Sequence, residues 1–139
     1  MAGDYNQYRA HNSSKVTDVL VLAATDYTTP TAIITVKSAN HRVYVQKISV
    51  NVTTYGSDTW TFQDSASTPV PIAFMSIPGA VVALASESGS IVFDFGPKGI
   101  ALTLGKNLNM TMSGTGSAGA IHVEAYEKLE GAVSLDVTQ

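Results

Sequence analysis

The sequence predicts an all-β protein, an antiparallel, jelly-roll-like β-sandwich with an extended N-terminal arm. Short apolar runs with alternating polarity recur about every ten residues between turn residues, giving about eight or nine strands. No convincing amphipathic helix interrupts them. Ser and Thr fill most polar positions, and Thr and Val suit pleated, half-buried surfaces. A plain sandwich and a jelly roll differ only in their connections, which the pattern does not reveal.

The N-terminal residues 1–15 are predicted to form the arm, and residues 16–139 a single β-sandwich domain. The arm lacks hydrophobic periodicity, but it carries aromatic and basic side chains that favour contact with protein more than those of an ordinary flexible tail do. Tyr and Arg anchor many protein interfaces, so the arm is a candidate interface with another subunit or another protein. The candidate residues are Tyr5, Tyr8, Arg9 and His11.

In chain order, the first half of the domain is predicted to hold five strands. Each run ends at a turn signal, such as Pro30 after the first run or the Ala39-Asn40-His41 turn after the second. The runs are residues 16–24, 31–38, 42–52, 59–62 and 70–78. Prolines flank the last run and make it a weaker strand.

The third run, residues 42–52, changes phase part-way along. Its apolar side chains occupy odd-numbered positions up to residue 45 and even-numbered positions from residue 48 onward, so in a regular strand the two groups would point to opposite faces. These side chains are Val43, Val45, Ile48, Val50 and Val52. The change falls at Gln46-Lys47 and predicts a β-bulge or a bend between sheets.

The second half is predicted to hold strands at 90–95, 108–113 and 120–128, and a last strand at 132–137. Alternation places six of their side chains inward: Ile91, Phe93, Phe95, Leu108, Met110 and Met112. Residues 96–99 form a turn. Residues 80–90 are ambiguous, and their first half fits either a strand or one short helical turn.

Gly114-x-Gly116-x-x-Gly119 has the spacing of a dinucleotide-binding loop. Such a loop needs a helix after the glycines, because the helix N-terminus holds the pyrophosphate. A strand pattern follows instead, so we interpret the glycines as a hairpin loop in which glycine supplies positive φ. Asp94-Phe95-Gly96 likewise matches a kinase magnesium motif, but no other kinase motif accompanies it. We expect Phe95 in the core and a turn starting at Gly96-Pro97.

Other groups that could carry chemistry are sparse. His122 and Glu124 share a strand face and would need Asp94 or another ligand to hold a metal, so we favour a solvated polar face. Carboxylates for glycoside hydrolysis could lie among Asp58, Asp64, Asp94 and Glu124, but acidic residues on a β surface are usually only solubilising. We therefore expect no enzyme, no catalytic residue, no metal and no cofactor.

A sugar-binding site would need an exposed aromatic ring, since such rings stack on pyranose faces. Trp60 shares a face with Phe62, which predicts a place in the core for both. Tyr55, beside Gly56 in a loop, is the better candidate for a ligand platform.

Composition excludes several classes of partner. The net charge is −3 and no run of Lys or Arg occurs, which disfavours nucleic acid and membrane surfaces. No apolar run approaches the ~18 residues of a membrane helix, and the N-terminus lacks a signal-peptide core. The chain has no cysteine and hence no disulfide framework. We expect a protein made in a cytoplasm.

Residues 93–128 read FDFGPKGIALTLGKNLNMTMSGTGSAGAIHVEAYEK, and residues 45–72 read VQKISVNVTTYGSDTWTFQDSASTPVPI. Both stretches resemble small virion proteins of tailed bacteriophages, namely head decoration (cement) proteins and related fibre modules. The resemblance implies a β-sandwich that forms trimers or dimers on the capsid exterior and clamps neighbouring copies of the major capsid protein. It implies no catalytic residue.

The sparsely charged sheets support the same expectation, because uncovered edge strands invite association with another chain. A homotrimer would bury those edges, and the arm could reach a neighbouring subunit. The alternative is a receptor- or carbohydrate-binding module of a phage head or tail fibre. A metal-dependent enzyme using His122 and Glu124 is the least favoured hypothesis.

Overall fold

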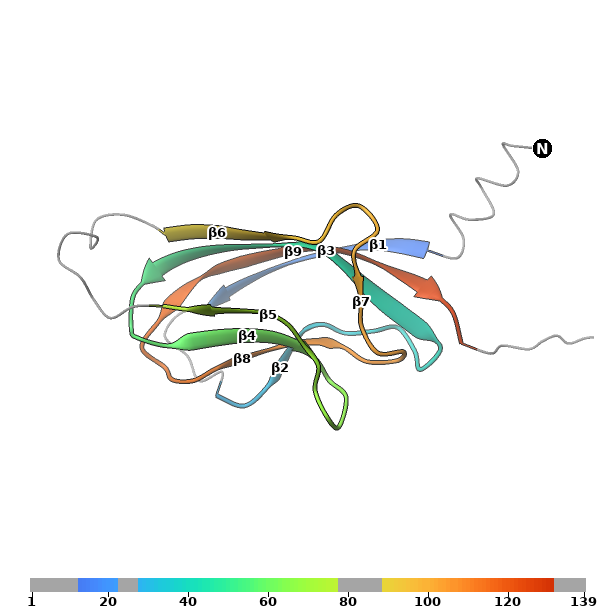
Figure 1. The fold of residues 1–139 in the computed structure, drawn as a ribbon, viewed down its shortest axis with the longest axis horizontal. Coiled ribbons are helices and arrows are strands. Elements are labelled where there is room, and N and C mark those ends of the chain that lie inside the picture. The colour runs from blue at the N-terminus through green and yellow to red at the C-terminus, as the bar shows by residue number, and fades with distance from the viewer. Residues whose placement is uncertain (1–12, 23–27, 78–88, 132–139) are drawn as a thin grey trace, which may run out of the picture.

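The computed structural model describes residues 13–22, 28–77 and 89–131, and these form two antiparallel sheets packed face to face (Figure 1). The five-stranded sheet has the order β1 (Ser13–Leu22), β9 (Ala118–Leu129), β3 (His41–Thr54) and β6 (Gly89–Asp94), and the short β7 (Ile100–Ala101) also pairs with β3. The four-stranded sheet has the order β2 (Thr31–Ile34), β8 (Leu108–Met112), β4 (Thr59–Asp64) and β5 (Pro71–Ser76).

The chain passes repeatedly from one sheet to the other. Among the described strands other than β7, only β4 and β5 are sequence neighbours that pair with each other, and each of the other connections crosses between the sheets. This interleaving of two four-stranded orders is that of a jelly roll. The predicted fold class is therefore confirmed, and the strand order decides between the two sandwich types that the sequence left open.

Side chains from the two inner faces form one core. Trp60 and Phe62 are fully buried, and the Phe62 ring meets Phe93 edge-on with ring centroids 6.2 Å apart. The inward prediction for Leu108, Met110 and Met112 is also confirmed. Burying each such side chain contributes roughly 1.5–3 kcal/mol, which makes this core the main source of stability.

The inward prediction for β6 is confirmed for the direction of its side chains, but one of them is not buried. Ile91 lies opposite Val50 in register, yet it is 40% exposed, whereas Phe93 and Phe95 are half-buried against the core. The reason is that β6 is an edge strand with a neighbour on one side only among the described strands. Alternation identifies the face of a side chain, but not whether a neighbouring strand covers it.

The predicted β-bulge in β3 is confirmed, because the β3–β9 register shifts between Val45 and Lys47. The extra residue, Gln46, fastens the turn at residues 96–99. Its carbonyl accepts the Phe95 N–H at 2.8 Å, and its Nε2 donates to the Pro97 carbonyl at 2.7 Å. The bulge thus places this turn over the outer face of the five-stranded sheet.

The glycine-rich loop is a crossing between sheets, so the hairpin prediction was wrong: β8 and β9 belong to different sheets. The expected positive φ is also absent from its three glycines. Close approach accounts for Gly119 instead, because a Cβ there would collide with the Asn51 carbonyl oxygen; a Cβ at Gly116 would be a tight fit, 3.0 Å from the Gly56 oxygen. The glycines lead into β9, a strand, and not into a helix.

Strand limits differ slightly from the prediction. β1 begins at Ser13, three residues before the expected start, and β2 ends at Ile34, before the expected residue 38. The ambiguous segment before β6 and the expected last strand at 132–137 lie outside the described residues. In the part of the chain that the structure describes, no helix is long and apolar enough to cross a membrane.

Candidate interaction surface

The outer face of the five-stranded sheet gathers polar and aromatic side chains from its two central strands. Inward positions of β3 and β9 are buried and apolar, with Glu127 as an exception, so the alternate positions point outward. These outward residues are Arg42, Tyr44, Lys47, Ser49, Asn51, His122, Glu124, Tyr126 and Lys128. The face is therefore half-buried, charged and aromatic.

Two tyrosines dominate one end of this face. Tyr44 and Tyr126 lie directly opposite each other in the β3–β9 register, and their rings stack with centroids 4.9 Å apart and planes 4° from parallel. The Lys128 ammonium lies 5.7 Å from the centroid of the Tyr44 ring, and the Tyr126 hydroxyl donates to the Lys98 carbonyl at 2.6 Å. The ring positions are thus held by contacts with two strands and the turn.

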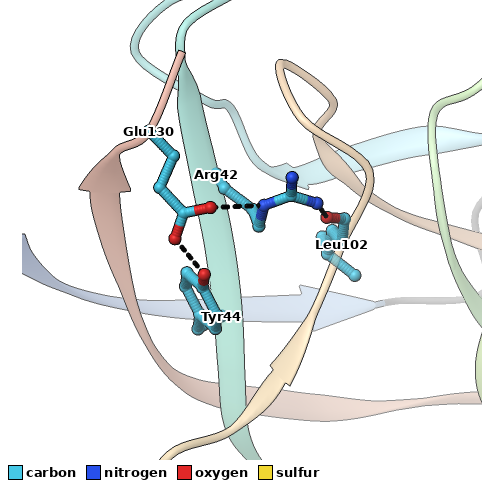
Figure 2. Close-up of polar contacts among 4 residues, drawn as sticks. All are labelled: Arg42, Tyr44, Leu102 and Glu130. Atoms are coloured by element: carbon cyan, nitrogen blue, oxygen red, sulfur yellow. Dashed lines mark hydrogen bonds and ion pairs between the residues drawn. The ribbon is translucent and has the colours of Figure 1, made fainter.

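A charged network completes this end, as Figure 2 shows. The Glu130 carboxylate accepts one hydrogen bond from Arg42 Nε at 2.8 Å and another from the Tyr44 hydroxyl. Arg42 also donates from Nη1 to the Leu102 carbonyl at 2.7 Å. We call Arg42, Tyr44, Tyr126, Lys128 and Glu130 the tyrosine cluster.

The network also fixes the charge states in the cluster. Burial, the hydrogen bond to Glu130 and the negative charge of that carboxylate raise the pKa of Tyr44 from 10.0 to about 12. The hydrogen bond from Tyr44 lowers the pKa of Glu130; burial opposes this effect, and Arg42 reinforces it. At neutral pH Tyr44 is therefore a hydrogen-bond donor and Glu130 an anion.

The N-terminal arm joins the fold beside this cluster. In the β1–β9 register Ser13 lies opposite Lys128, and Lys15 lies opposite Tyr126. Residues 1–12 therefore connect to the domain at the same end of the sheet as the tyrosine cluster. The four predicted interface residues of the arm (Tyr5, Tyr8, Arg9 and His11) lie outside the described residues.

The other end of the same face is hollowed. A cavity of about 270 Å³ is lined mainly by Ser49, Asn51, Ser90, Val92, Ala120 and His122. Val92 is 55% exposed there, while the Ser90 hydroxyl donates to the Asn51 side chain at 3.3 Å. The hollow is shallow and largely apolar, with a polar rim.

The residues considered for a metal site lie between the hollow and the tyrosine cluster, except His122, which lines the hollow. Lys47 pairs with Glu124 on one side and with Asp94 on the other, so a lysine separates the two carboxylates across the sheet. His122 lies one outward position away, opposite Ser49. Within the described ranges no group of three or more His, Asp or Glu residues could hold a metal ion.

The remaining carboxylates of the sequence analysis have structural contacts. Asp58 accepts the Ser117 N–H at 2.7 Å and fastens the glycine-rich crossing. Asp64 is buried beneath the loops that follow β4 and β7. Asp94 is exposed, and its Oδ1 accepts the Gly96 N–H at 2.9 Å.

Tyr55 is less exposed than the sequence suggested. It is half-buried, packs against the core and lines a cavity of about 120 Å³ between the sheets, together with Val52, Met75, Ile77 and Ile91. A ring in this position fills space beside the core. An exposed platform has to be sought elsewhere.

Sequence reasoning missed the tyrosine cluster, although part of its signal is visible. Alternate positions from His122 to Glu130 are all polar or aromatic, which marks one face of β9. The second half of the signal lies in β3, where Arg42 and Tyr44 occupy the same parity. Only the β3–β9 pairing brings the two halves together.

Comparison with known proteins shows likeness in fold alone. No protein-family model matches the chain, and no curated protein is similar to it. Eiger TNF from S. frugiperda is 11% identical, with 94% of this chain and 93% of that chain covered and a TM-score of 0.42. A protein chain from the virus-like particle of the giant freshwater prawn Macrobrachium rosenbergii extra small virus is 6% identical to this chain. The match covers 83% of this chain and 78% of that chain, with a TM-score of 0.41. A disulfide-linked pilus protein of Bacillus endospore appendages is 13% identical over 86% and 88%, with a TM-score of 0.38.

Proposed function

We propose that this chain is a structural virion protein that decorates and stabilises a bacteriophage capsid by clamping neighbouring capsid subunits. One observation carries the proposal: the arm joins the domain beside a tyrosine cluster whose side chains are already held in place. Tyrosine and arginine are enriched among the residues that dominate binding energy at protein interfaces. Side chains ordered before binding lose less entropy when a partner arrives.

The dimensions of the arm are compatible with a clamp. Twelve residues precede Ser13, and an extended chain of that length spans at most about 40 Å. A sheet of this width measures roughly 20 Å across its strands, so an arm could pass beyond its own domain to a neighbouring subunit. The partners proposed are the major capsid protein and further copies of this chain, on the capsid exterior.

Open sheet edges support self-association. Among the described strands, β1 and β2 lie at edges of their sheets, and β6 and β5 at the opposite edges. Unpaired backbone groups on such edges accept another chain unless charge or cover prevents it. We propose a homotrimer, in which part of these edges is buried. Jelly rolls occur in viral capsids and in lectins, so the fold permits the proposal without deciding it.

The proposal is tested by binding to empty shells assembled from the major capsid protein of the same virus. The intact chain is expected to co-sediment with shells, and a variant lacking residues 1–12 to lose at least tenfold in affinity while its unfolding midpoint stays the same. Phe74→Ala, on the outer face of the other sheet, is the matched control and should bind shells normally. Undiminished binding by the truncated chain would refute the clamp.

Light scattering after size exclusion tests the oligomer separately. A trimer has three times the chain mass of 14.6 kDa. A monomer at low micromolar concentration, combined with normal shell binding, would reject the homotrimer and leave the decoration role standing.

A further inference from the structure

The outer face of the four-stranded sheet has a different chemistry from that of the five-stranded sheet. On β4 and β8 the buried positions alternate with outward ones, and β2 and β5 continue the same rows. The outward residues are Ala32, Thr59, Thr61, Gln63, Phe74, Ser76, Asn109 and Thr111. None of them is charged; the one acidic residue of these strands, Asp64, is buried.

An aromatic ring stands on this uncharged face. Phe74 is 66% exposed, and it lies opposite Thr61, which in turn lies opposite Thr111 on β8. In the neighbouring row Gln63 lies opposite Asn109. Neighbouring strands are about 4.8 Å apart, so the ring and these hydroxyl and amide groups lie within one small area.

Several of the polar groups are available for a ligand. In the described part of the chain, the side chains of Thr61, Gln63 and Asn109 have no hydrogen-bond partner. Amides offer both a donor and an acceptor, and a hydroxyl offers either. They therefore match a ligand that carries many hydroxyl groups and no charge.

We propose that this face binds a neutral oligosaccharide, whose sugar ring stacks on Phe74 and whose hydroxyls bond to Thr61, Gln63 and Asn109. The ring supplies a flat apolar surface for the C–H face of a pyranose. Because the face carries no charged side chain, a neutral ligand that covers it does not bury an unpaired charge of the protein. Exposure of a large phenylalanine on an edge strand then has a functional reason.

The size of the face favours a small ligand over a protein. Four strands at about 4.8 Å and about five residues at roughly 3.4 Å give an area of roughly 300 Å². A stable protein interface buries about 800 Å² on each partner. A second copy of this chain would need contacts well beyond the face, whereas a short oligosaccharide would be accommodated within it.

This inference is independent of the proposed function, and the two fit together geometrically. The two sheets of a sandwich turn their outer faces in opposite directions (Figure 1). If the end with the tyrosine cluster meets the shell, the uncharged face is directed away from that contact. A decoration protein would then present a site for neutral surface polysaccharide.

The test is a titration of the intact chain with linear neutral oligosaccharides of glucose, galactose, mannose and xylose, followed by nuclear magnetic resonance of backbone amides. Oligosaccharides of uronic acids serve as the charged comparison series. We expect at least one neutral series to bind at millimolar concentration or below, with shifts confined to β4, β5 and β8. Phe74→Ala should weaken that binding at least tenfold, and Asn109→Ala should weaken it as a second, independent variant. Arg42→Ala, in the tyrosine cluster, is the control and should bind normally.

Three results would overturn the inference: no shift with any neutral series, tighter binding of the charged series, or unchanged affinity in both Phe74→Ala and Asn109→Ala. If Phe74→Ala instead loses shell binding or changes the oligomer, the face is a protein interface and the sugar site is rejected. Loss of shell binding only in the variant without residues 1–12 bears on the clamp and not on this site, so failures of the two proposals are distinguishable.

Discussion

Replacement of Asp64 by asparagine is expected to destabilise the domain by roughly 2 kcal/mol. Asp64 is 1% exposed, and its carboxylate holds two loops together. Oδ1 accepts the N–H groups of Ala66 at 3.2 Å and Val70 at 3.0 Å. Oδ2 accepts the Thr103 hydroxyl at 2.5 Å and the Thr103 N–H at 3.4 Å. Asparagine keeps one acceptor oxygen, but its amide nitrogen cannot accept the Thr103 N–H.

The magnitude follows from the kind of hydrogen bond. A hydrogen bond to a charged group contributes about 1.5–3 kcal/mol and a neutral one about 1 kcal/mol, so losing the charge and one acceptor costs roughly 2 kcal/mol. With about 2.1 cal/mol/K of unfolding entropy per residue, that loss lowers the Tm of a chain of 139 residues by about 7 °C. Asp94→Asn is the matched control, because Asp94 is exposed and the asparagine oxygen can still accept the Gly96 N–H.

The effect also has a predicted pH dependence. Burial raises the pKa of Asp64, but the hydrogen bonds from Thr103, Val70 and Ala66 together outweigh burial, and the net pKa lies below its ordinary value. A carboxyl group with a lowered pKa in the folded state stabilises fully above its unfolded pKa of about 3.9 and loses this contribution as pH falls through the folded pKa. The Tm difference between the parent and Asp64→Asn should therefore be constant from about pH 5 to 8 and shrink below about pH 4. Calorimetry that finds a difference under 2 °C at pH 7, or one that widens in acid, would refute this reasoning.

Two further substitutions follow from the geometry. In Glu130→Gln the pKa of Tyr44 should fall from about 12 toward 10.0, because both the negative charge and the carboxylate acceptor are removed; a phenolate titration by ultraviolet absorbance measures it, and an unchanged pKa would contradict the assignment. In Gly119→Ala the new Cβ would collide with the Asn51 carbonyl, so we expect a loss of about 1–3 kcal/mol in denaturant unfolding. Gly96→Ala is the comparison. The new Cβ has no neighbour within 4 Å, so we expect only the cost of a positive φ in a residue other than glycine, about 1 kcal/mol. A larger loss in Gly96→Ala would reverse the argument.

The sequence predicted well those features that depend on period-two alternation. The phase change in β3 identified the bulge at Gln46, because an added residue inverts the parity of all residues that follow. Trp60 and Phe62 were placed in the core for the same reason. Local pattern is sufficient where the strand itself determines which side chains turn inward.

Features that depend on strand pairing could not be predicted. The glycine-rich loop follows one strand and precedes another, and nothing local tells whether those strands pair or lie in opposite sheets. The requirement for Gly119 comes from Asn51, which is distant in sequence. Tyr44 and Tyr126 likewise meet only through the β3–β9 register. Loop position alone suggested exposure for Tyr55, but the ring turns back against the core.

The energetics of the tyrosine cluster indicate that its contacts fix the positions of its side chains more than they add to the free energy of unfolding. The Arg42 and Glu130 side chains remain 29% and 25% exposed, and ion pairs near the surface contribute about 0–1 kcal/mol. Stacked rings add about 0.5–1.5 kcal/mol. Arg42→Ala should therefore leave the domain folded, with a loss of about 1–2 kcal/mol in denaturant unfolding, because the Leu102 carbonyl also loses its donor. Yet the same change frees Glu130 and Tyr44 from their fixed geometry, so shell binding should weaken far more than stability does. A variant that loses stability but binds shells as the parent does would show that the cluster serves the fold and not an interface.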